Sequence, residues 1–319
     1  MRIRYLRDPL SVLAVIGSLA PGIGCGGVKG QAPPDAVADS TTDAPPDAAP
    51  PARCDPAKPF GTPTLIPNIN SSARDQGAEL IDDLTIIFGS DRPPGTGLYT
   101  ATRTSPTSPF STPTPLTAIN ATGVVTGPTL TADGLTMYYA LATGQDMGDI
   151  YVTHRNSKGD LFAPGTPVTG LNSSTADLDP FISADGSTLY FDSARATGTA
   201  LHLYFAVRQA NGSFTAPQPL TALNTNFVDG HPVLSRDGLT LYWSSTRTDG
   251  GAQGVTDLWM ASRSSTAGDF GAPVRVPELS SSSGESPSWI SPDHCMVLLQ
   301  SDRLGGLGAQ DIYQAVRPL

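Results

Sequence analysis

The chain has 319 residues, including 33 Gly and 30 Pro, and a formal net charge of −10 at pH 7. Gly and Pro together supply about a fifth of the residues, which favours many short strands joined by turns over long helices. The acidic charge, without clustered Lys and Arg beyond the first residues, argues against a nucleic-acid partner.

The first 25 residues have the features of an export signal. Residues 1–8 carry three arginines, and the apolar run 9–20 is too short to span a bilayer as a stable helix. The next segment, Gly22-Ile23-Gly24-Cys25, resembles the lipobox of bacterial lipoproteins, although Gly22 stands where such motifs usually carry leucine. The resemblance implies a signal peptide over 1–25 and lipidation of Cys25. An ordinary cleaved secretion signal is the alternative.

Residues 26–58 are almost devoid of large apolar side chains and rich in Pro, Ala and Asp. Such a segment cannot bury enough surface to offset the entropy of ordering. The sequence therefore predicts a disordered tether over 26–58, followed by one folded domain over 59–319.

From residue 59 the chain repeats a unit of about 50 residues, a period typical of β-propeller blades. A phenylalanine opens each of the five copies, at Phe60, Phe110, Phe162, Phe214 and Phe270. Asp-Gly pairs such as Asp185-Gly186 and Asp237-Gly238 mark tight hairpin turns between apolar runs. Each copy thus contributes several antiparallel strands.

Three segments carry a family resemblance: ISADGSTLYFDSAR, LSRDGLTLYWSSTR and SDRLGGLGAQDIY. They resemble the TolB-like, WD-repeat-like β-propellers. With the repeat count, this predicts an all-β fold, a five-bladed β-propeller of four-stranded antiparallel blades. The first copy begins with an outer strand and the last copy lacks one, so the N-terminal strand is expected to close the last blade. The blades are expected at 75–118, 125–170, 177–222, 229–278 and 285–317 plus 59–68.

Arginines recur after the second strand of the repeat, at Arg92, Arg195, Arg247 and Arg303, and the second copy has Ala142 there. Acids open the third strand at Asp149, Asp257 and Asp311. These acids and arginines could pair across the intervening loop, and both partners coexist only in the fourth and fifth copies. We expect a structural ion pair or a loop-closing hydrogen bond there, rather than a catalytic pair.

Acidic side chains gather just before the innermost strands, which line the channel of a propeller. They are Asp75, Asp177, Asp179, Asp229 and Glu285, with His231 beside them. This mouth, opposite the tether, is the candidate binding face for a basic partner or a cation such as calcium. Caps and turn-stabilising hydrogen bonds are the simpler alternative. The four histidines fall at four different repeat positions, so no zinc site and no cofactor are predicted.

Two cysteines remain once Cys25 carries lipid. Cys54 lies shortly before the closing strand, and Cys295 follows the first hairpin turn of the same blade. A short segment can bridge the strand that separates them, and an oxidising compartment favours pairing. We expect a Cys54–Cys295 disulfide; the alternative is a buried Cys295 and a free Cys54.

The sequence favours a non-catalytic lipoprotein of the bacterial cell envelope, at the periplasmic side of the outer membrane or at the cell surface. It is expected to be a monomer, bound to the membrane by its lipid, that presents a propeller face to a protein, peptide or glycan. A five-bladed glycosidase using Asp177, Asp229 and Glu285 is one alternative. A purely structural envelope protein is the other.

Overall fold

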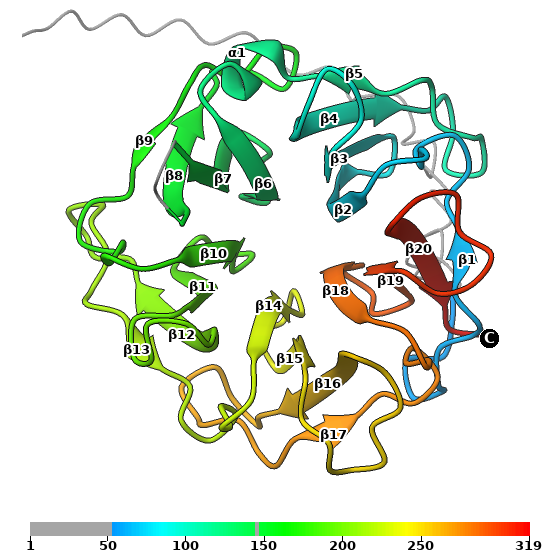
Figure 1. Ribbon diagram of the computed structural model, residues 1–319, viewed down its shortest axis with the longest axis vertical. Helices are drawn as coiled ribbons and strands as arrows, with labels where there is room; N and C mark the ends of the chain where they lie inside the picture. The colour runs from blue at the N-terminus through cyan, green and yellow to red at the C-terminus, as the bar shows by residue number, and fades with distance from the viewer. Residues whose placement is uncertain (1–52, 144–146) are drawn as a thin grey trace, which may run out of the picture. The chain divides into compact units, whose positions relative to one another are not determined.

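Five four-stranded antiparallel sheets stand around a central axis (Figure 1) in the computed structural model, which describes residues 53–143 and 147–319. The predicted signal peptide, Cys25 and the predicted tether up to residue 52 lie outside the described residues. Residues 53–58, which the sequence assigns to the tether, instead pack on the last blade. Within the described residues no helix is long and apolar enough to cross a membrane.

The strands of each blade run in chain order from the channel outward, and the last blade is completed by the first strand of the chain. Blade 1 contains β2 (Asp75–Asp82), β3 (Thr85–Ser90), β4 (Gly97–Thr102) and β5 (Thr114–Pro115). Blade 2 contains β6 (Val124–Leu130), β7 (Thr136–Ala142), β8 (Asp149–His154) and β9 (Thr166–Pro167), and the short helix α1 (Thr117–Asn120) precedes it. Blade 3 contains β10 (Asp177–Ile182), β11 (Thr188–Ser193), β12 (His202–Val207) and β13 (Gln218–Pro219). Blade 4 contains β14 (Asp229–Leu234), β15 (Thr240–Ser245), β16 (Asp257–Ser262) and β17 (Val274–Arg275). Blade 5 contains β18 (Glu285–Ile290), β19 (Met296–Ser301), β20 (Asp311–Val316) and β1 (Thr64–Leu65). The predicted five-bladed, all-β architecture and its N-terminal closure are confirmed.

The core lies between neighbouring blades. One buried cluster joins Val233 and Tyr242 of blade 4 to Val297 and Leu299 of blade 5. In the closed ring each blade has a neighbour on both faces. Its strands therefore carry large apolar side chains on both faces, and these pack at two interfaces.

The asparagine that recurs in the repeat completes the backbone hydrogen bonding of the third strand. Asn172 Oδ1 accepts the Ile150 N–H at 2.8 Å, while its Nδ2 donates to the Ile150 carbonyl at 3.0 Å. Asn120, Asn224 and Asn70 make the same pair of bonds to Leu98, Leu203 and Ile312. The outer strands have only two residues, so a side-chain amide continues the ladder that they leave unfinished.

The recurring phenylalanine and the closing arginine of the repeat form a second unit. Arg155 stacks on Phe162 with 4.4 Å between guanidinium carbon and ring centroid, and its Nε donates to the Gly134 carbonyl. Arg103, Arg263 and Arg317 stack likewise on Phe110, Phe270 and Phe60. Each such arginine ties the first hairpin turn of a blade to its outer edge.

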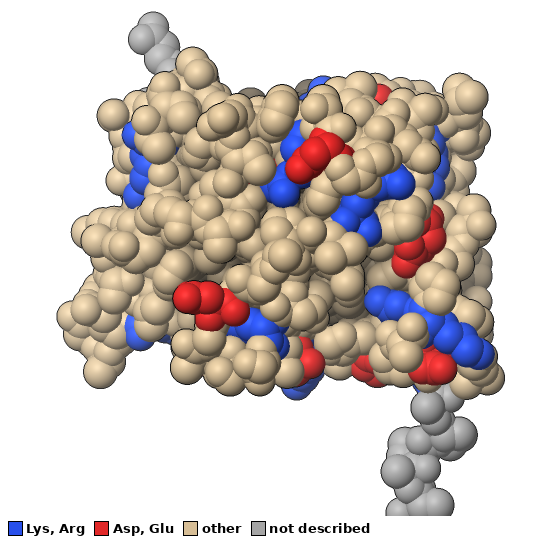
Figure 2. Space-filling model, turned by 90° about the horizontal axis from the view of Figure 1, so that it is seen from below, with Lys and Arg blue, Asp and Glu red and all other residues tan. Residues whose placement is uncertain are grey.

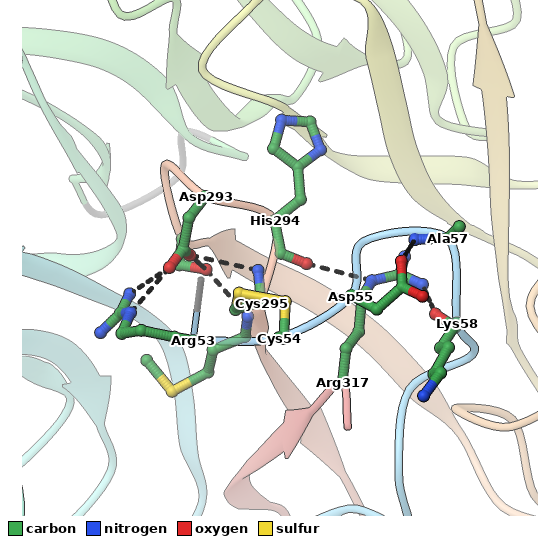
Figure 3. The surroundings of a disulfide bond; sticks show 11 residues. Arg53, Cys54, Asp55, Ala57, Lys58, Asp293, His294, Cys295 and Arg317 are labelled. Carbon is green, nitrogen blue, oxygen red and sulfur yellow. Dashed lines mark hydrogen bonds and ion pairs between the residues drawn. A yellow bond between two sulfur atoms is a disulfide. The ribbon is translucent and has the colours of Figure 1, made fainter. Parts of the chain in front are cut away.

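The ring closes through β1, which pairs Thr64 with Gln314 and Leu65 with Tyr313. Ahead of β1, Cys54 and Cys295 form a disulfide with a Cα–Cα distance of 5.5 Å, and Arg53 pairs with Asp293 at 2.7 Å (Figure 3). The start and the end of the domain are thus joined covalently as well as by a strand pair.

Candidate functional site

Arginines and acids pair at one mouth of the channel in four of the five blades. The Nη2 of the arginine that follows the second strand forms an ion pair with an acid at the start of the inner strand. Its Nε donates to a serine that lies two residues before it. The pairs are Arg92–Asp75 (2.6 Å), Arg195–Asp177 (2.5 Å), Arg247–Asp229 (2.7 Å) and Arg303–Glu285 (3.3 Å), and the serines are Ser90, Ser193, Ser245 and Ser301. We call this unit the arginine clasp.

The arginines pair with acids of the inner strand, so an ion pair between them and the third-strand acids is not formed within the described ranges. The alternative expected there, a loop-closing hydrogen bond, is found. Asp257 and Asp311 instead accept backbone N–H groups of the loops before them, from Gln253 and Gly254 and from Leu307 and Gly308. Asp257 also lies 3.6 Å from Arg275 of the outer strand. Asp149 does not face a clasp arginine in the described residues, because its blade has none.

The clasp changes the role of four residues assigned to the candidate binding face. Asp75, Asp177, Asp229 and Glu285 are fully buried. Each also accepts hydrogen bonds from the loop that leads into its strand; Asp177, for example, accepts the Ser173 N–H and hydroxyl. These carboxylates are therefore partnered within the fold. Asp177, Asp229 and Glu285, which the glycosidase alternative would use, are each paired with an arginine.

Blade 2 replaces the clasp with other residues. The strand register places Val125 at the acid position, Leu141 at the serine position and Thr143 at the arginine position. Ala142, which the sequence aligned with the arginines, therefore lies one residue before that position. Val125 and Leu141 are buried, so an apolar contact stands where the other blades have an ion pair.

Each inner strand has an irregularity close to the residue that lies two positions after the clasp acid, or after Val125 in blade 2. These residues, Gly77, Gly127, Asp179, His231 and Pro287, line a space of about 30 Å³. A Cβ on Gly127 would lie 2.9 Å from Asp179 Oδ1, so blade 2 has room only for glycine. Asp179 and His231 adopt left-handed backbone, with φ of 45° and 53°. We call this level the neck.

Two members of the predicted binding face, Asp179 and His231, meet at the neck with a carboxylate that sequence analysis missed. His231 Nε2 lies 3.3 Å from Asp179 Oδ2, and Asp192 Oδ2 accepts the His231 backbone N–H at 2.9 Å. Asp192 lies on β11, the second strand of blade 3. Burial, and then the charge of Asp179, raise the pKa of Asp192 well above its usual range. Its sequence signal was a departure from the repeat: the other blades carry Gly89, Ala140, Ser244 and Gln300 there.

The other mouth, on the side of the first hairpin turns, opens into a cavity of about 350 Å³. We call it the funnel. All five blades line it with the ends of their inner strands, and Phe181, Trp289 and Met296 are its large, half-buried apolar side chains. Four charged residues also line it: Arg53, Asp82, Asp83 and Arg236. The funnel was not predicted, because its residues look like ordinary core positions in the sequence.

A buried carboxyl group forms part of the funnel wall. Glu79 accepts the Leu130 N–H at 3.1 Å, and its Oε2 has no hydrogen-bond partner among the described residues. Burial raises the pKa of Glu79 to about 8. The carboxyl group is therefore neutral at pH 7.

Glu79→Gln is expected to flatten the dependence of stability on pH. Because the folded pKa lies above the unfolded value of 4.5, the folded protein binds the extra proton, and stability falls as the pH rises from about 4.5 to about 8. Urea unfolding of both proteins at pH 5 and pH 8.5 measures the difference. Equal losses of stability over this interval would show that Glu79 is not the responsible group.

Charged side chains are sparse on the outer surface of the ring that Figure 2 shows. Blue and red atoms lie next to one another in small groups, and most of this side is uncharged. This side of the ring therefore offers no broad charged surface to a partner.

Comparisons with known proteins show the fold. No protein-family model and no curated protein matches the chain. Among solved structures, a thermostable family-43 glycoside hydrolase is 11% identical with a TM-score of 0.52, and 79% of this chain aligns with 92% of it. An α-L-arabinofuranosidase from Lactobacillus brevis is 12% identical with a TM-score of 0.51, with the same coverage of 79% and 92%.

TolB from Acinetobacter baumannii is 18% identical with a TM-score of 0.45, and 81% of this chain aligns with 54% of that chain. The chain thus spans about half the length of that TolB. At these identities the likeness extends to architecture only. The protein is a five-bladed β-propeller, and its structural neighbours include both TolB and glycoside hydrolase propellers.

Proposed function

We propose that the protein is an exported, non-catalytic binding propeller of the bacterial cell envelope that receives an extended peptide segment of a partner in the funnel. The observation that carries the proposal is the funnel itself, a cavity of about 350 Å³ to which all five blades contribute. Because the inner strands of all five blades line it, the funnel lies at a mouth of the central channel. The mouths of β-barrels are common places for ligand sites.

The chemistry of the funnel favours a peptide over a glycan. Phe181, Trp289 and Met296 offer apolar surface, and methionine adapts to side chains of different shape. A glycan would need several charged or amide groups directed at its hydroxyls, whereas the carboxyl group of Glu79 is buried in the wall. An extended segment carrying one or two large apolar side chains fits the cavity, and the charged residues of the lining fix its polar backbone.

The candidate binding face that the sequence favoured supports this function less well. Its four clasp acids are buried, so the acidic character that selected that face does not reach solvent. We therefore place the binding site for the partner at the mouth of the channel that carries the first hairpin turns. Arg53, the residue before the disulfide, belongs to the lining on this side.

Ala132→Arg should block peptide binding without disturbing the core. Ala132 is an exposed residue in the funnel wall, on the turn after β6, and a guanidinium there fills the mouth. Ala216→Arg is the matched control, because Ala216 is also exposed and lies outside the funnel. The full chain is immobilised and panned against a random-peptide phage library, and the affinities of the selected peptides are measured.

We expect peptides rich in large apolar residues, with binding weakened at least about tenfold by Ala132→Arg and unchanged by Ala216→Arg. Thermal unfolding of both variants should match the parent. Selection of no peptide, or equal binding by both variants, would reject the funnel as the site.

A glycosidase remains the second candidate, and the observation that favours it is Glu79. A carboxyl group whose pKa is raised to about 8 is protonated at neutral pH, as the general acid of a glycosidase must be. Release of reducing sugar from arabinan and from arabinoxylan is the test, since a structural neighbour is an α-L-arabinofuranosidase. Activity that disappears with Glu79→Gln would establish the enzyme and displace the binding proposal.

Export is supported by the Cys54–Cys295 disulfide, since such bonds persist in oxidising compartments. If Cys25 is the lipidated residue, Cys25→Ser should move the protein from the membrane fraction to the soluble fraction. Stable attachment needs more than one acyl chain, which a lipoprotein cysteine supplies. Detergent-phase partitioning of parent and variant measures this, and unchanged partitioning would contradict lipid anchoring.

A further inference from the structure

The neck holds three potential metal ligands from two neighbouring blades. Asp179 and His231 come from the inner strands β10 and β14, and Asp192 comes from β11. One donor atom of each residue lies within 4.8 Å of the other two. The spacing of His231 Nε2 and Asp179 Oδ2 is 3.3 Å. Bonds of about 2.1 Å to a tetrahedral metal would put two ligand atoms about 3.4 Å apart.

Asp192 supplies an unpartnered atom to this group. The residue is fully buried, and while Oδ2 accepts the His231 N–H, Oδ1 has no hydrogen-bond partner among the described residues. Leaving a buried carboxylate oxygen without a donor is costly. A cation bound beside Oδ1 would remove that cost.

The orientation of the imidazole points to the same place. Ser244 Oγ donates to the Gly230 carbonyl at 3.1 Å and lies 3.4 Å from His231 Nδ1. With the hydroxyl hydrogen on that carbonyl, the contact favours the tautomer that carries its proton on Nδ1, and the Nε2 lone pair then faces the Asp179 carboxylate. In that tautomer two acceptors at 3.3 Å repel one another unless a cation or a second proton lies between them. An acceptor at Nδ1 also orients histidine ligands of metals.

We propose that Asp179, Asp192 and His231 bind a first-row divalent transition metal such as Zn²⁺, with a fourth coordination position open to the channel. One imidazole and two carboxylates suit such metals, whereas Ca²⁺ takes six to eight oxygen ligands. The neck beside the group has a space of about 30 Å³, enough for a water ligand. The site stands apart from the funnel proposal and does not depend on it.

Metal titration of the full chain tests the site. The chain carries Cys25→Ser so that no free thiol competes, is freed of metal with a chelator, and is titrated calorimetrically with Zn²⁺ and with Ca²⁺. We expect one Zn²⁺ per chain, much weaker Ca²⁺ binding, and a rise in Tm with Zn²⁺. Asp192→Asn and His231→Gln should each weaken Zn²⁺ binding more than about 100-fold, and Ser244→Ala about 10- to 100-fold.

The matched control is His294→Gln. His294 also has left-handed backbone, with φ of 60°, and its Nε2 lies 3.5 Å from an Asp237 oxygen, but it sits on the hairpin turn between β18 and β19, away from the neck. Zn²⁺ binding that is lost with His294→Gln, or that persists in Asp192→Asn and His231→Gln, would overturn the assignment. A folded parent that binds no Zn²⁺ would also overturn it, whatever the variants do. In that case a shared proton, and not a metal, would hold the three side chains together.

Discussion

Deletion of residues 58–69 is expected to unfold the propeller or to leave it aggregated. The deletion removes β1 and with it Phe60, Ile66 and Ile69, all of which are buried. Burial of each such side chain contributes about 1.5–3 kcal/mol, so the summed loss approaches the whole net stability of about 5–15 kcal/mol of a typical domain. It also exposes the edge of β20 to pairing with other chains.

Circular dichroism during heating and size-exclusion chromatography measure this effect. A deletion of equal length within the predicted tether, residues 35–46, is the control and should leave the Tm unchanged. A shortened chain that stays monomeric with the parent's Tm would show that β1 does not hold the ring together.

The second large effect is expected from Arg247→Met, at about 3–5 kcal/mol of unfolding free energy. Arg247 is the most buried clasp arginine, with 5% of its side chain exposed, and its partner Asp229 has none. Removal of the guanidinium leaves a buried carboxylate that keeps its hydrogen bonds from Thr225 but loses its countercharge. Urea unfolding measures the loss.

Two variants control for the size of the side chain and for the charge. Arg263→Met removes an arginine of the same blade that stacks on Phe270 and has no buried carboxylate partner within the part of the chain that the structure describes, so about 1 kcal/mol is expected. Addition of Asp229→Val and Ser245→Leu to Arg247→Met copies the apolar arrangement of blade 2 and should recover at least half of the loss. Equal losses for Arg247→Met and Arg263→Met would show that the buried charge is not the cause.

The fold was readable from the sequence because each copy of the repeat carries its own turn chemistry and its own strand pattern. Asp185-Gly186 and Asp237-Gly238 fix hairpins, and a surplus outer strand at Phe60 matches the missing one after Arg317. The sequence did not show that the clasp arginines meet the acids of the inner strands. A repeat shows which residue types recur, but not which strand ends lie side by side. The register pairs Asp177 with Ser193, two residues before Arg195, and that neighbourhood appears only once the hairpin is folded.

The neck and the funnel were harder to foresee for a different reason. Asp192 occurs in one blade only, so a search for recurring residues passes over it. Phe181 and Trp289 occupy positions that serve the core elsewhere, and only the closed ring shows that their edges line a cavity. Sites that depend on departures from a repeat need the three-dimensional neighbours before they can be recognised.

The pairing of Thr64 with Gln314 also bears on when this protein can finish folding. A chain that is made from its N-terminus delivers β1 first, yet the partner strand β20 (Asp311–Val316) comes last. Contacts that span almost the whole domain form slowly, because a very long loop must close before they bring any gain. Until β20 has been made the ring stays open, and closure of the ring is what holds Cys54 beside Cys295. Oxidation of that pair then fixes the closed ring covalently.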